Sequence, residues 1–114
     1  MKKKVRSYGE YYIQKFLDYN NIQYIKEKTF KDCLSLKNNR LRFDFYLPNQ
    51  NILIEFQGPH HYKPVNKGRR AKRVHKTTVL HDKIKRNFCK KNDIKLLEIK
   101  QIKNIYETLL EELN

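Results

Sequence analysis

The sequence has few of the residues that break a chain into separate units or cross-link it. Among its 114 residues are no Trp, one Met, three Gly, three Pro and two Cys. With so few Gly and Pro there is no linker-like segment, so one domain over residues 1–114 is expected. Cys33 and Cys89 are too few for a disulfide framework, and we expect reduced thiols in a cytosolic protein.

Long apolar runs are also missing, since none approaches the ~20 residues of a membrane span. The basic start Met1-Lys2-Lys3-Lys4 is not followed by an apolar segment, so no signal peptide is expected. The chain is nonetheless 39% hydrophobic and contains eight Tyr and six Phe, enough for an ordinary core. These features exclude membrane-spanning, secreted, collagenous and disordered classes.

Acidic residues are scarce relative to basic ones. Lys and Arg number 26 against 12 Asp and Glu, which gives a formal net charge of +14. The excess is concentrated in residues 58–91, which carry twelve basic residues and only Asp82. Such a local positive field favours a polyphosphate partner, so nucleic-acid binding is expected. A membrane-surface role is less favoured, because no clean apolar stripe precedes residue 79.

The pattern of apolar residues predicts the element order α-β-β-β-α-β-α. Residues 31–39 are interpreted as a turn and residues 58–76 as a basic loop. A strand-helix-strand crossover in the second half implies an α/β fold with a mixed four-stranded sheet flanked by helices. The expected elements are a helix over 7–20, strands over 22–30, 41–47 and 52–57, a helix from Thr77 or Thr78 to about Lys91, a strand over 94–99 and a helix over 102–113.

Two carboxylates lie where strands normally carry apolar residues. Asp44 lies within an aromatic strand, and Glu55 lies near the end of the next strand, two residues before Gln57. A hairpin turning at 48–51 places both carboxylates on one face, where they would repel by about 3 kcal/mol at an effective dielectric of 20. A divalent cation offsets this repulsion, and oxygen ligands favour Mg²⁺ or Mn²⁺. The alternative is pairing of Asp44 with Arg42 and of Glu55 with a lysine of the basic helix.

The motifs and their order resemble the PD-(D/E)XK nuclease superfamily, which has a restriction-endonuclease-like αβββαβ core. The resemblance is closer to small phage and bacterial members similar to very-short-patch-repair and homing endonucleases. It covers nearly the whole chain. The matching segments are Gly9-Glu10, Asp44-Phe45-Tyr46-Leu47-Pro48, Ile54-Glu55-Phe56-Gln57-Gly58, His61-Tyr62 and Asp82-Lys83-Ile84-Lys85.

The resemblance implies a metal-dependent DNA endonuclease in the cytoplasm of a bacterial or phage-infected cell. Asp44, Glu55 and the Phe56 carbonyl would hold Mg²⁺ or Mn²⁺. Glu10 has two interpretations: it either completes a capping box with Ser7 or helps to hold the metal or a water.

One position departs from the superfamily pattern, because Gln57 stands where a lysine is usual. Gln57 would position the attacking water, or Lys85 from the following helix, with Lys83 as the second choice, would take the lysine's place. Asp82 and Lys85 share a helix face and could equally form a surface ion pair. His61 would contact the scissile phosphate or donate a proton, unless it is only a loop histidine. The expected catalytic set is Glu10, Asp44, Glu55, Gln57, His61 and Lys85.

The basic segment is expected to grip backbone phosphates. The residues concerned are Lys63, Lys67, Arg69, Arg70, Lys72, Arg73 and Lys76. Homing, repair and junction substrates all remain open. A homodimer would suit cleavage of two strands, with the exposed side of 102–113 as a candidate surface. The alternatives are a non-catalytic nucleic-acid-binding module on a nuclease fold and a small RNA-binding protein whose carboxylates are buried in ion pairs.

Overall fold

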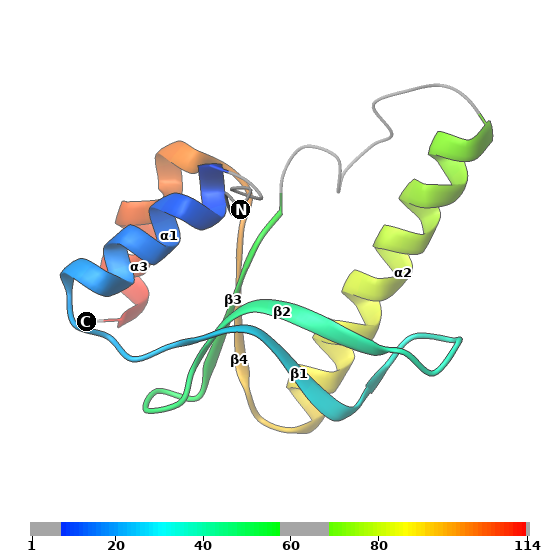
Figure 1. Cartoon of the computed structure of the whole chain (residues 1–114), viewed down its shortest axis with the longest axis horizontal. Helices are drawn as coiled ribbons and strands as arrows, with labels where there is room; N and C mark the ends of the chain where they lie inside the picture. The colour runs from blue at the N-terminus through cyan, green and yellow to red at the C-terminus, as the bar shows by residue number, and fades with distance from the viewer. Residues whose placement is uncertain (1–7, 58–68, 114) are drawn as a thin grey trace, which may run out of the picture.

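A four-stranded mixed sheet forms the centre of the protein (Figure 1). The computed structural model describes residues 8–57 and 69–113. The strand order β1-β2-β3-β4 follows the sequence; the first two pairings are antiparallel and β3–β4 is parallel. The α/β class and the mixed sheet expected from the sequence are confirmed. The strands are β1 (Ile25–Leu34), β2 (Arg40–Leu47), β3 (Ile52–Phe56) and β4 (Lys95–Ile99).

Helices cover the sheet from two sides, as the crossover between β3 and β4 predicted. Figure 1 shows α1 and α3 together on one side and α2 on the other. No helix within the described ranges is both long and apolar enough to cross a membrane. The helices are α1 (Tyr8–Tyr19), α2 (Arg69–Lys91) and α3 (Ile105–Leu113), with a short 3₁₀ helix, η2 (Ile102–Asn104), before α3.

Two hydrophobic clusters hold the helices to the sheet. The first joins α1 and α3 to residues such as Phe45 and Ile54, and the second joins α2 to residues such as Phe43 and Leu53. Phe43 and Phe45 are both fully buried, as the strand alternation predicted, but they belong to different clusters. Asp44 lies between them in β2. The residue opposite Asp44 on β1 is Glu27, which has a left-handed backbone with φ 54°. The sheet therefore distorts where the site carboxylates lie.

The two cysteines lie in the second cluster as free thiols. Burial and, second, the Cys33 sulfur raise the pKa of Cys89 to about 12, and burial also raises the pKa of Cys33. Both thiols therefore stay protonated at neutral pH. The predicted absence of a disulfide framework is confirmed.

The first strand differs from its predicted position. β1 runs from Ile25 to Leu34, whereas the sequence predicted a strand over 22–30 followed by a turn. Pairing with β2 continues to Leu34↔Arg40 after a register shift, so backbone hydrogen bonds extend the strand despite its polar side chains. Cys33 is fully buried by this extension.

The predicted start of the second helix is also wrong. α2 begins at Arg69, inside the segment interpreted as a basic loop. Thr77 and Thr78, interpreted as helix caps, instead donate their hydroxyls to the carbonyls of Arg73 and Val74 one turn earlier. Arg, Ala and Lys have high helix propensity, and no Gly or Pro interrupts the segment after Arg69, so the helix extends through it.

Candidate active site

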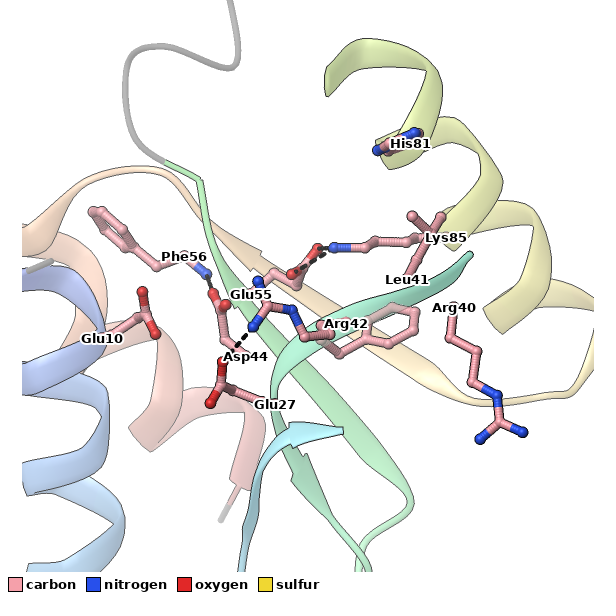
Figure 2. Close-up of a pocket in the computed structure, with 11 residues that line it drawn as sticks. Glu10, Glu27, Arg40, Leu41, Arg42, Asp44, Glu55, Phe56, His81 and Lys85 are labelled. Carbon is pink, nitrogen blue, oxygen red and sulfur yellow. Dashed lines mark hydrogen bonds and ion pairs between the residues drawn. The ribbon is translucent and has the colours of Figure 1, made fainter. Parts of the chain in front are cut away.

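An open pocket of about 400 Å³ lies where the ends of β2 and β3 meet α1 and α2 (Figure 2). Four carboxylates and several basic groups line it, although the protein as a whole is strongly basic. The pocket thus brings together side chains from five elements of the fold. The charged and polar residues that line it are Glu10, Glu27, Arg40, Arg42, Asp44, Glu55, His81 and Lys85.

Asp44 lies at the point where β2 and β3 separate. Counted from the hairpin turn, the last backbone pair between these strands is Phe45↔Ile54, and Asp44 is the next residue of β2 beyond it. Beyond it, Asp44 Oδ2 accepts a hydrogen bond of 2.8 Å from the backbone N–H of Phe56. The carboxylate therefore continues the link between the strands and is held facing the pocket. Arg42, which the sequence offered as a partner for Asp44, pairs with Glu27 at 2.7 Å.

Glu55 is buried beside Asp44, with 7% of its surface exposed. Lys85 Nζ lies 3.0 Å from both of its carboxylate oxygens. Dashed lines mark these contacts in Figure 2. Burial raises the pKa of Glu55 to about 7; Lys85 opposes that rise, whereas Asp44 and Asp82 add to it. Ionised Glu55 therefore depends on a neighbouring cation. The pairing with a helix lysine, one of the two alternatives from the sequence, is what the structure contains.

Glu10 reaches the pocket because Gly9 precedes it. Gly9 is buried, and a Cβ at this position would overlap the ring of Phe56. The absence of a side chain lets the first turn of α1 approach the end of β3, and this approach places Glu10 on the pocket wall. Ser7, the expected partner of Glu10 in a capping box, lies outside the described residues.

Gln57 is not among the residues that line the pocket, although the sequence placed it in the catalytic set. It is 2% exposed, and its Nε2 donates to Glu98 Oε2 on β4. Glu98 also accepts hydrogen bonds of 2.9 and 3.0 Å from Arg86 Nε on α2. The side chain of Gln57 therefore ties β3 to β4 and α2, and Lys85 is the nitrogen donor that faces the pocket.

Helical spacing brings His81 to the pocket, and the sequence analysis missed it. His81 precedes Lys85 by four residues, so the two share a face of α2. That spacing was the signal that could have found it. Asp82 is only 6% exposed, so the surface ion pair considered for Asp82 and Lys85 is not what forms. His61 lies outside the described residues.

Some of the predicted phosphate-binding residues lie on α2, and others lie outside the described residues. Lys63 and Lys67 lie outside the described residues. Arg70 belongs to α2. The other predicted residues are exposed on the first turns of that helix rather than on a loop: Arg69, Lys72, Arg73 and Lys76.

The donor set suits a hard divalent cation. Asp44 and Glu55 supply two carboxylates in one pocket, next to Phe56 and Glu10. Within residues 8–57 and 69–113, no group of three or more His, Cys, Asp or Glu side chains is arranged to hold a metal ion. A positive group, the Lys85 ammonium, already balances Glu55 in this space.

No protein-family model, curated protein or solved structure matches this chain.

Replacing Lys85 with Met should destabilise the fold in a pH-dependent way. Without the ammonium, the pKa of Glu55 rises further above 7. A carboxyl group with a raised pKa in the folded state makes the fold less stable as pH rises. The free energy of unfolding of the variant should therefore be about 2 kcal/mol below that of wild type at pH 8.5 and little different at pH 5. Urea denaturation followed by circular dichroism measures both values.

The matched control for that experiment is Lys83→Met, because Lys83 is exposed two residues earlier on the same helix. Adding Glu55→Gln to Lys85→Met removes the ionisable group and should abolish the pH dependence of the difference. Equal destabilisation of Lys85→Met at the two pH values would contradict the assigned ion pair.

Proposed function

We propose that this protein is a divalent-metal-dependent endonuclease of the PD-(D/E)XK superfamily that hydrolyses phosphodiester bonds in DNA. The observation that carries the proposal is the convergence of Asp44, Glu55 and Lys85, from three different elements, in one open pocket. Two acidic groups and one basic group in a cleft of a strongly basic protein suit the chemistry of a phosphodiester substrate.

The architecture supports the same proposal. A helix, three antiparallel strands, a helix and a parallel strand follow one another, which is the αβββαβ order of the restriction-endonuclease-like core. The two carboxylates lie on the second and third strands, and Glu10 lies on the first helix. Each occupies the element that the resemblance assigns to it.

Asp44, Glu55 and the Phe56 carbonyl are the groups that would hold Mg²⁺ or Mn²⁺. A divalent ion bound there would polarise a phosphate oxygen and lower the pKa of a bound water. Such an ion would add to the positive charge of Lys85 beside Glu55, whose charged form is disfavoured by burial and by the nearby carboxylates. Glu10 also lines the pocket, and we propose that it helps to hold the metal or a water there.

Lys85 takes the role that the superfamily pattern gives to the residue at position 57. Its ammonium is held inside the pocket by Glu55, whereas Gln57 is engaged by Glu98. We propose that Lys85 stabilises the negative charge that develops on the scissile phosphate. His81 lies one turn away on α2 and also lines the pocket, so we assign to it the proton donated to the leaving oxygen.

A second candidate function is a non-catalytic nucleic-acid-binding module. The observation that favours it is the Lys85–Glu55 ion pair, which neutralises the buried carboxylate without a metal. In this case DNA binding would be unaffected by a chelator, and no strand would be cut.

The deciding experiment is a cleavage panel. Supercoiled plasmid and labelled linear, nicked, mismatched, branched and single-stranded DNA are incubated with the protein and Mg²⁺, Mn²⁺, Ca²⁺ or EDTA. A nuclease should cut at least one substrate with Mg²⁺ or Mn²⁺ and none with EDTA. Tight binding with no cleavage of any substrate would overturn the proposal in favour of the binding module.

A further inference from the structure

The first half of α2 extends beyond the body of the protein (Figure 1). The residues of α2 that pack in the second cluster begin at Ile84. Before that point Val74 is 58% exposed and Val79 is 45% exposed. The start of the helix, from Arg69 to Leu80, is about 18 Å long and precedes the part of α2 that packs in the second cluster.

Five exposed cations follow one face of this helix, and we call them the outer cation row. An α-helix turns by about 100° per residue, so positions three, four and seven apart share a face. With this spacing the row occupies one continuous face over about 21 Å. Its members are Arg69, Lys72, Arg73, Lys76 and Lys83.

The outer cation row faces away from the pocket. Lys76 precedes Lys85 by nine residues, which places it about 180° around the helix. The other four members lie about 120° to 160° from Lys85 by the same rule. Lys85 points inward to Glu55, with 13% of its side chain exposed, so the row points to the opposite side. A nucleic-acid strand held against the pocket would therefore lie on the other side of the helix from these cations.

The row also differs in its charge balance from two cations that line the pocket. Arg42 and Lys85 each have a carboxylate partner. The structure gives the five cations of the outer row no such partner among the residues it describes. No acidic residue occurs on α2 before Asp82, which is buried. The row is thus an unneutralised line of charge.

We propose that the outer cation row binds a second duplex segment of the same substrate, so that the substrate class is branched DNA. The inference rests on the proposed endonuclease function. A 21 Å row spans about six base pairs at 3.4 Å each, and the major groove admits an α-helix. One duplex arm would lie at the pocket and another on the outer side of α2, and a branched molecule supplies two such arms.

The test compares two triple variants with matched charge changes. Lys72→Gln/Lys76→Gln/Lys83→Gln alters the row, and Lys15→Gln/Lys91→Gln/Lys103→Gln alters exposed lysines elsewhere. Fluorescence anisotropy with a labelled four-way junction and a labelled linear duplex, in EDTA at several salt concentrations, gives each affinity. Because EDTA prevents cleavage, the measurement stands whether or not the protein cuts DNA.

Wild type and the control variant should bind the junction more tightly than the linear duplex. The affinity of the row variant should fall about tenfold or more for the junction and little for the duplex. The slope of its log affinity for the junction against log salt concentration should fall in magnitude by about 2 to 3. Equal losses on both DNAs would overturn the proposal, because the row would then bind the same segment as the pocket. No loss on either would overturn it too, since the row would be only a solvated face.

Discussion

Cleavage by the Asp44→Asn variant is expected to be about 10³-fold slower than by wild type, with the fold intact. Asn keeps an oxygen that can accept the hydrogen bond from the Phe56 N–H, so the link between β2 and β3 survives. What the substitution removes is one negative charge and one anionic metal ligand. The loss of rate would therefore report the chemistry of the site rather than its architecture. Initial rates on the best substrate of the cleavage panel provide the measurement.

The control for this variant is Asp32→Asn, which makes the same change at an exposed position of β1. Asp32 does not line the pocket, and its variant should cut at the wild-type rate. Thermal unfolding and DNA affinity in EDTA should match wild type for both variants. Wild-type activity in Asp44→Asn, with the same metal requirement, would remove Asp44 from the mechanism.

The pH dependence of stability should be dominated by Glu55, whose pKa is raised to about 7 in the folded protein. The ordinary pKa of a glutamate is about 4.3, so the folded state binds this proton more tightly than the unfolded state. The stability that this tighter binding contributes is present below pH 4 and is lost as pH rises through 7. The free energy of unfolding of wild type should therefore fall by about 3 kcal/mol between pH 4 and pH 8. That of Glu55→Gln should not show this fall.

Urea denaturation across this pH range measures the difference between the two proteins. Glu107→Gln, an exposed position on α3, is the control and should follow the wild-type profile. Mg²⁺ should raise the unfolding temperature of wild type at pH 8 and leave that of Glu55→Gln unchanged, because a ligand stabilises only the state that binds it. Parallel pH profiles for wild type and Glu55→Gln would show that Glu55 is not buried as described.

Most of the fold could be predicted from residue periodicity. The alternation from Leu41 to Leu47 matches β2, and the apolar run from Ile52 matches β3, which is buried along nearly its whole length. Local chain preferences and burial agree in these segments, so the pattern is sufficient. The polar end of β1 had no such pattern, because Cys33 and its neighbours are held by pairing to β2.

The start of α2 was missed for a related reason. Six cations in ten residues favour a loop, and two threonines favour a helix cap. Helix propensity favoured the helix throughout, and mutual repulsion between exposed cations in water is too weak to prevent it. The misplaced boundary had a functional consequence, because the helical spacing of Lys72, Lys76 and Lys83 forms the outer cation row only if the helix begins at Arg69.

From the sequence alone came the order of the elements, the surplus of positive charge and the two carboxylates that strands rarely contain. Those properties depend on residue types and near neighbours. Only the tertiary structure decided that Lys85 reaches Glu55, that Gln57 turns to Glu98, and that His81 joins the pocket. These contacts depend on how α2 crosses the sheet, and the crossing is set by packing between residues more than 30 positions apart, such as Phe43 and Phe88.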